Sequence, residues 1–175
     1  MAYQENGSGA ILSTAQSITT SAASTNVFDV TGAGVGVLPT MIGAGNVNTA
    51  LGTDLGTGQG VAHPGVLFEV TTTGTGTGTI AFAIQAAPDS GTGTEGTYTT
   101  LTQSAAAVGT TLVAGGSVYL PLPPVPSNYS GLPRFYRAYS VQTGNGAVSV
   151  SAQLLMNPPD IKSVLQFGRT YTSAY

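Results

Sequence analysis

Glycine and proline are the residues that most constrain how this chain can fold. The 175 residues include 25 glycines and 10 prolines, which divide most of the chain into segments too short for stable helices. β-Branched residues dominate between these breaks, and they favour strands. About eight strands are therefore expected, at residues 10–20, 25–30, 66–73, 79–86, 98–103, 117–120, 135–141 and 147–156.

Alternation of side chains along these segments predicts which faces are buried. Val66, Phe68 and Val70 fall on one face of their strand, with Leu67 and Glu69 on the other. The same rule groups Ile80, Phe82 and Ile84 in one strand, and Val148, Val150, Ala152 and Leu154 in another. Short strands separated by turn-rich loops are typical of an all-β jelly roll, which is a two-sheet antiparallel β-sandwich. We expect at most one short helical turn.

The chain is expected to form one domain with extended arms. The sandwich spans 10–156 and includes a glycine-rich excursion at about 32–65, between an N-terminal arm at 1–9 and a C-terminal arm at 157–175. Two consecutive prolines end the last strand, because proline cannot donate to the ladder. The C-terminal arm has more apolar side chains than a disordered tail usually keeps, so the arms are expected to touch a partner. The candidate contacts are Tyr3, Ile161, Val164, Leu165, Phe167, Tyr171 and Tyr175.

A run of alternating glycine and threonine, Gly74 to Gly78, allows two interpretations. It could be a phosphate-binding loop or the tip of a hairpin. A dinucleotide site requires G-x-G-x-x-G followed by a helix, but the spacing is G-x-G-x-G and a period-two strand follows. No Gly-Lys-Ser/Thr occurs for a P-loop either. The run predicts a turn, and no cofactor is expected.

Charge is scarce, and this limits the kinds of partner. Only 6% of residues are charged, against about 25% in ordinary soluble domains, and the net charge is −3. Direct binding to nucleic acid is not expected, because it requires many Lys and Arg to displace counterions. A neutral surface suits a protein that is largely covered by partners, or one that lives outside the cell.

Three further patterns indicate where the protein is made and whether it enters a membrane. There is no cysteine, so disulfides and thiolate metal sites are excluded. No apolar run approaches the roughly 18 residues of a membrane span. The N-terminal residues lack the basic and apolar regions of a signal peptide. We expect synthesis in a cytoplasm and no membrane partner.

Few residues suit catalysis. His63 is the only histidine. Spacing alone does not exclude a serine–histidine–carboxylate site, because the residues of such triads come together from distant parts of a fold. Asp89 and Glu95 lie close in sequence and could hold a weak loop cation, although the EF-hand pattern fails there. The remaining acidic residues are scattered. We expect a protein that is not an enzyme and has no metal site.

The segment from Leu132 to Val141 is the most distinctive, because it holds two of the four basic residues among aromatic ones. Such a strip could stack on single-stranded nucleic acid, but two arginines in an acidic chain make a poor track for it. The alternative is a strand in which Arg134 and Arg137 form structural ion pairs. The expected partners are Glu69, Asp29 or Asp160. Parity leaves the buried face open, since Phe135, Tyr139 and Val141 share a side with Arg137.

Four segments together resemble a known family. They are GSGAILSTAQSITTSAASTNVFDVTGAG near the start, the Gly-Thr hairpin, and LPRFYRAYSV with GAVSVSAQLLMNPPDI near the end. In this order they are similar to the capsid cement, or decoration, proteins of certain short-tailed bacteriophages. The resemblance runs from about Gly7 to Ile161. It implies a jelly roll that forms homodimers and clamps the major capsid protein from outside, made in the host bacterial cytoplasm and ending on the virion exterior.

A glycan- or receptor-binding jelly roll on the virion is the alternative. Lectin-like sandwiches present aromatic side chains to sugars. Absence of tryptophan counts against a glycan groove. The side chains expected to be exposed for this role are Tyr98, Tyr119, Tyr129 and Tyr136.

Overall fold

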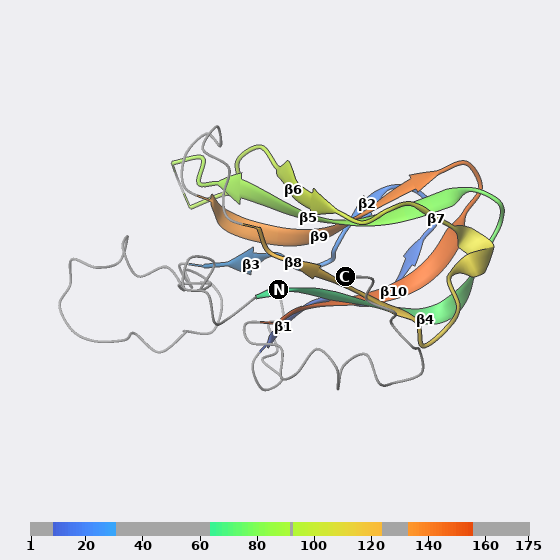
Figure 1. Ribbon diagram of the computed structural model, residues 1–175. Coiled ribbons are helices and arrows are strands. Elements are labelled where there is room, and N and C mark those ends of the chain that lie inside the picture. The colour runs from blue at the N-terminus through green and yellow to red at the C-terminus, as the bar shows by residue number, and fades with distance from the viewer. Residues whose placement is uncertain (1–8, 31–63, 92, 124–132, 156–175) are drawn as a thin grey trace.

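The computed structural model describes residues 9–30, 64–91, 93–123 and 133–155, which form two β-sheets packed face to face (Figure 1). Within these residues the only helical element is one 3-10 turn, so the expected all-β fold is confirmed. The elements are β1 (Gly9–Ile18), β2 (Ala22–Ala23), β3 (Phe28–Asp29), β4 (Gly65–Thr75), β5 (Thr79–Pro88), β6 (Thr99–Gln103), β7 (Ala107–Val108), η1 (Gly109–Thr111), β8 (Ser117–Pro121), β9 (Pro133–Thr143) and β10 (Ala147–Leu155).

The strand order is that of a jelly roll. One sheet has the order β1-β10-β4-β8, and the other has β2-β9-β5-β6, with β3 also pairing with β9 and β7 with β5. Because β2 and β3 both pair with β9, and β6 and β7 both pair with β5, each pair acts as one interrupted strand. Numbered as eight strands, the sheets read 1-8-3-6 and 2-7-4-5, all antiparallel. The predicted jelly-roll sandwich is therefore confirmed.

The break between β2 and β3 has a local cause. The sequence predicts a single strand over 25–30, but the chain between β2 and β3 leaves the six-stranded sheet and bonds to β1 in the other sheet. The Asn26 backbone N–H donates to the Leu12 carbonyl at 2.8 Å, and the Asn26 side-chain amide donates to the Ile11 carbonyl at 3.2 Å. The Ser24 hydroxyl stabilises this crossing by donating to the Asn26 carbonyl at 2.8 Å. The crossing ties the two sheets together along one side.

The core lies between the sheets and follows the predicted alternation. The inward faces of 66–70, 80–84 and 148–154 are all buried, as the sequence predicts. Phe68 from one sheet stacks on Phe82 from the other, with ring centroids 4.9 Å apart. Strand β5 departs from simple alternation, because its outward-facing alanines are also buried beneath larger side chains on β9. A central strand covered on both faces anchors the sheet firmly.

The Gly-Thr run is a hairpin tip, and its glycines are there for close packing. The backbone N–H groups of Thr77 and Gly78 both donate to the side-chain oxygen of Asn145, at 3.1 and 2.9 Å. Asn145 belongs to the β9–β10 turn, so the two tips are docked. A Cβ on Gly78 would lie 2.2 Å from the Thr143 carbonyl oxygen. Only glycine allows this approach, and the N–H groups that a phosphate would need are already occupied.

Every edge of the two sheets is irregular. Strand β1 has a bulge between Ile11 and Gln16, where its register against β10 shifts twice. Strand β8, the opposite edge, is only five residues long and ends at Pro121. The edges of the six-stranded sheet are the interrupted pairs β2–β3 and β6–β7. None of the four edges presents a long, straight row of backbone groups.

The predicted N-terminal arm ends one residue early, because Gly9 already belongs to β1. The rest of that arm, the C-terminal arm and most of the glycine-rich excursion lie outside the described residues, so they stay predictions. In the described part of the chain, no helix has the length and hydropathy needed to cross a membrane.

Candidate functional site

Strand β9 carries both arginines of the distinctive segment, and the structure settles which of its faces is buried. Tyr136, Ala138 and Ser140 point into the sandwich and are buried. The other set, including Arg137 and Tyr139, therefore lies on the outer face of the six-stranded sheet. Sequence parity could not decide this, because both sets mix apolar and polar side chains.

Arg137 is held in a cluster on this outer face. Its guanidinium carbon lies 3.6 Å from the centre of the Tyr98 ring and 5.6 Å from that of Tyr139. Its Nε donates to the side-chain oxygen of Gln85 on β5 at 2.9 Å. We call Arg137, Tyr98, Tyr139 and Gln85 the Arg137 cluster. Among the described residues Arg137 makes no ion pair, and a neutral amide and aromatic rings orient it instead.

Arg134, three positions earlier, lies among carboxylates. It donates to both oxygens of Asp29 on β3, from Nε at 3.0 Å and from Nη2 at 2.9 Å. Its third nitrogen, Nη1, bonds to Asp89 in the loop after β5. Asp29 is only 7% exposed, and its hydrogen bond is the main reason that the pKa of Arg134 is raised. Arg134 thus joins three segments of the six-stranded sheet at one end. Asp29 is among the partners expected from sequence, and Asp89 is not.

The carboxylate of Asp89 accepts hydrogen bonds at both of its oxygens. One oxygen accepts the backbone N–H groups of Gly91 at 2.8 Å and Gly93 at 2.9 Å, while the other accepts Arg134. The hydrogen bond from Gly91 is the largest cause that lowers the pKa of Asp89, and those from Gly93 and Arg134 add to it. Asp89 pairs with Glu95 only as a backbone bridge that closes the loop. Because its oxygens face N–H donors, this carboxylate is poorly placed to hold a cation.

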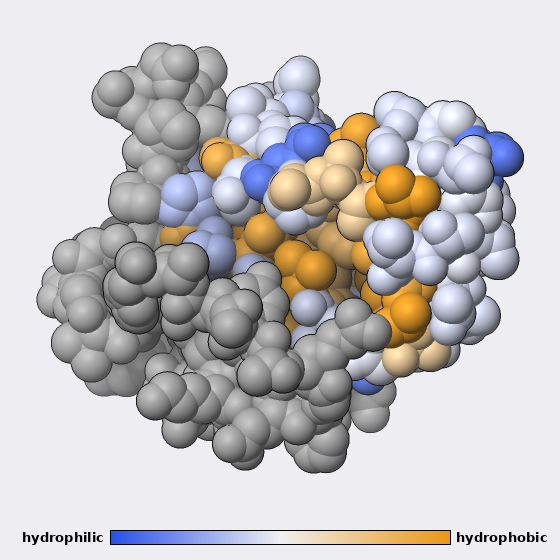
Figure 2. Space-filling model, turned by 45° about the vertical axis from the view of Figure 1, so that its right-hand side comes forward, coloured by the Kyte–Doolittle hydropathy of each residue, from blue (hydrophilic) through white to orange (hydrophobic). Residues whose placement is uncertain are grey.

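A second feature of the surface is apolar. Hydrophobic side chains gather in a hollow on the face of the molecule shown in Figure 2. On β6, β7 and β8, Leu101, Ala107 and Val118 are partly buried against the core, and Val108 is the most exposed large hydrophobic residue described, at 37%. This apolar side is a second candidate for partner contact.

The tyrosines expected to be exposed for glycan binding are placed differently. Tyr136 is 5% exposed and belongs to the core, so its predicted exposure is wrong. Its inward parity on β9 is the physical reason. Tyr98 and Tyr119 are half-buried, and burial raises the pKa of Tyr119. Tyr129 lies outside the described residues. Among the described tyrosines, Tyr98 comes just before β6 of the six-stranded sheet and Tyr119 lies in β8 of the other sheet, so these two do not share a sheet.

Several other candidates also fall outside the described residues. They include His63, Asp160 and all of the predicted partner contacts: Tyr3, Ile161, Val164, Leu165, Phe167, Tyr171 and Tyr175. Across the described ranges, no three His, Cys, Asp or Glu side chains gather into a metal-binding group. Sequence reasoning missed that Gln85 bonds to Arg137 and that Asp89 bonds to Arg134, because these pairs are 52 and 45 positions apart and no local spacing signals them.

Comparison of the sequence with protein-family models and with curated proteins finds no match to either.

Proposed function

We propose that this protein is a structural virion protein, which binds the outer surface of a phage capsid and stabilises contacts between major capsid protein subunits. The resemblance of its segments to the capsid cement family motivates the proposal. The jelly-roll sandwich supports it, because a rigid two-sheet domain with a docked hairpin end can bridge neighbouring subunits without deforming.

The Arg137 cluster is the observation that carries the proposal. Arginine and tyrosine are the side chains most enriched at the energetic centres of protein interfaces. Here the arginine is already oriented by Tyr98 and Gln85, so little side-chain entropy is lost when a partner covers it. Its terminal nitrogens can donate to carbonyl or carboxylate groups of a capsid subunit. We therefore assign the outer face of the six-stranded sheet to the capsid.

Self-association is part of the same proposal. The chain carries little charge to keep copies apart, and the family resemblance implies pairs. The irregular edges of both sheets disfavour pairing strand to strand, so a homodimer would use faces. The apolar side around Val108 is available for that contact. The C-terminal arm, from Ile161 to Tyr175, is proposed from sequence as a further contact with the shell.

The test is co-sedimentation with assembled phage heads that lack this protein, with unassembled capsid subunits as the comparison. The wild-type chain should bind heads and not free subunits. Arg137→Ala should weaken binding by about tenfold or more, the loss expected at an interface hot spot. Glu69→Gln is the matched control, because Glu69 is exposed on the outer face of the other sheet. If wild type and Arg137→Ala bind heads equally well, the outer face of the six-stranded sheet is not the surface that contacts the capsid. Failure of the wild type to bind heads, with retention on glycan arrays, would support the receptor-binding alternative.

A further inference from the structure

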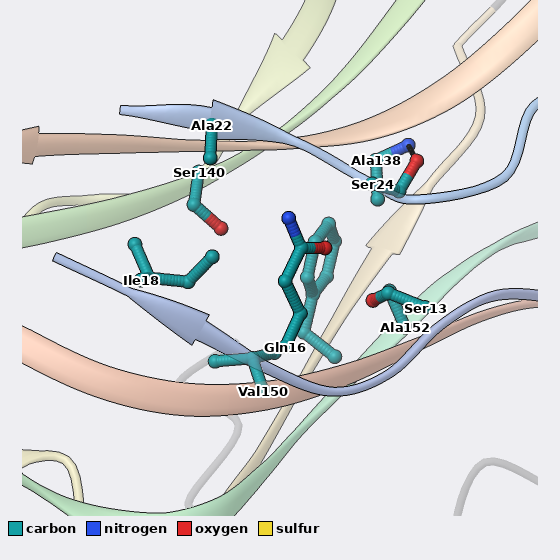
Figure 3. A pocket seen from close by; sticks show the side chains of 10 residues that line it. Ser13, Gln16, Ile18, Ala22, Ser24, Ala138, Ser140, Val150 and Ala152 are labelled. Atoms are coloured by element: carbon teal, nitrogen blue, oxygen red, sulfur yellow. Dashed lines mark hydrogen bonds between the residues drawn. The ribbon is translucent and has the colours of Figure 1, made fainter. Parts of the chain in front are cut away.

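A small cavity lies between the two sheets, on the side where β1 faces β2 and β9 (Figure 3). Its volume is about 10 Å³, which is close to that of a single water molecule by the same measure and too small for any larger ligand. Phe68, Val150 and Ala152 form apolar walls. The other side of the cavity is polar, which is unusual for a space inside a sandwich core.

Two serine hydroxyls point into this cavity from opposite sheets. Ser13 comes from β1 and Ser140 from β9, and Figure 3 shows their oxygens directed towards the middle of the lined space, with the Gln16 amide between them in this view. Ser13 is 4% exposed and Ser140 is 5% exposed. Neither hydroxyl has a hydrogen-bond partner among the described residues. Neither oxygen is among the fully buried polar atoms that lack a partner, so each keeps some surface open to this space, and one small polar molecule there can bond to both.

Gln16 supplies a third polar atom. Its side-chain nitrogen donates to the Ala23 carbonyl at 2.7 Å, which fixes the amide across the opening. Its side-chain oxygen then remains as an acceptor beside the cavity (Figure 3). Ser24, which also lines the cavity, is already satisfied: it donates to Asn26 and accepts from the Ala138 N–H. Three polar atoms with spare capacity therefore surround the space.

The bulge in β1 explains why a serine occupies an inward position. Between Ile11 and Gln16 the strand contains two more residues than β10 does opposite it. One extra residue lies between Ile11 and Ser13, and the other lies between Ser13 and Gln16, where Ala15 has a left-handed φ of 44° and donates its N–H to the Ser151 hydroxyl. As a result Ser13 is buried directly beside the buried Leu12. A regular strand would turn one of these neighbours outward.

We propose that this cavity binds one internal water molecule, which hydrogen-bonds to Ser13 and Ser140 and to the Gln16 amide oxygen. The water joins the four-stranded sheet to the six-stranded sheet through polar contacts. It meets the usual requirement for an internal water, which is two to four polar partners in a site of matching size. A dry cavity would leave both hydroxyls unsatisfied.

The first test measures the water in the wild-type protein. Water-to-protein NOEs should appear at the methyl protons of Val150 and Ala152, and a high-resolution crystal structure should show one ordered water between the two serines. Ser13→Ala combined with Ser140→Ala should abolish the NOEs. Absence of both signals in the wild type, or NOEs that persist in the double variant, would overturn the proposal.

The second test uses the direction of the stability change. With water bound, Ser140→Ala removes one of its partners and should lower the melting temperature. In a dry cavity the same change would remove an unsatisfied hydroxyl and should raise it. Ser149→Ala is the control, because Ser149 lies on the outer face of β10 and should change the melting temperature little. A higher melting temperature for Ser140→Ala than for wild type would contradict the bound water. If a variant misfolds, the NOE measurement on the wild-type protein alone tests the proposal: its presence supports the bound water and its absence contradicts it.

Discussion

Two arginines on the same strand have opposite surroundings. Arg134 is bonded to the carboxylates of Asp29 and Asp89, and joins segments that are 105 and 45 positions away. Arg137 is stacked on tyrosines and bonded to a neutral amide. Two of the chain's few acids are thus concentrated on one arginine, and among the described residues the other has none. The difference separates an arginine that ties parts of the fold together from one that has no carboxylate partner among the described residues.

Under the proposed function, this division lets a few charges serve both stability and recognition. An exposed ion pair contributes little, because water screens it and the side chains lose entropy. A pair with a carboxylate as buried as Asp29 matters more, since removing one partner leaves a charge in a poorly solvated place. A rigid arginine without a carboxylate keeps its bonding capacity for another surface.

The largest effect is expected at Arg134. Arg134→Ala should lower the free energy of unfolding by about 2–4 kcal/mol, because it removes the bidentate partner of a buried carboxylate. Urea denaturation followed by far-ultraviolet circular dichroism measures this. Arg134→Lys should recover only part of the loss, since an ammonium cannot bond both Asp29 oxygens in the same plane. A loss below about 0.5 kcal/mol, the value of a surface pair, would erase the distinction between the two arginines.

Arg137 should matter less for folding. Arg137→Ala should cost about 1 kcal/mol, the usual size of a cation–π contact near the surface. The same denaturation assay applies, so the two variants can be compared directly. A loss for Arg137→Ala that equals or exceeds that for Arg134→Ala would reverse the assignment, and would make weakened capsid binding by this variant uninterpretable.

Lowering the pH should affect the stability contributed by the Arg134 and Asp89 site but not that contributed by the Arg137 cluster. We expect this effect to be the smallest of the three. The pKa of Asp89 is lowered in the folded chain, chiefly by the Gly91 hydrogen bond, so the folded state favours the ionised carboxylate. The resulting stability is complete at pH values above 3.8, the ordinary pKa of an aspartate, and is lost as the pH falls through the lower pKa of the folded state. Asp89→Asn should flatten the fall in melting temperature below about pH 4. Substituting Gln85, which does not titrate, should leave that slope as steep as in wild type.

The sequence predicts the fold better than it predicts the surface. Alternation along 66–70 and 148–154 is a local property, so the buried faces and the sandwich follow from it. The bulge at Ala15 has no such signal, because its left-handed backbone is imposed by pairing with β10. The inward position of Tyr136 escapes prediction for a similar reason. Its strand alternates between two sets of comparable hydropathy, and only the partner strands decide between them.

The sequence could predict an ion pair between an arginine and a carboxylate, but it could not predict which residues form it. The chain has seven acidic residues that the two arginines could pair with. Which of these acids an arginine contacts depends on how the loops are arranged at the end of the sheet. Asp89 reaches Arg134 because β5 ends at Pro88 beside the start of β9. The Arg137 cluster depends in the same way on the register of β5 against β9, which brings Gln85 opposite it.

The irregular edges of the two sheets have a consequence for life at high concentration. With only 6% charged residues, copies of this chain have little electrostatic repulsion to prevent aggregation when they are concentrated. An uninterrupted edge would let each copy extend the sheet of the next and start an open-ended fibre. The bulge in β1, the breaks between β2 and β3 and between β6 and β7, and the short β8 each shorten or distort that template. The chain can therefore do without the charges that most proteins use to stay dispersed, because its backbone geometry provides part of the same protection.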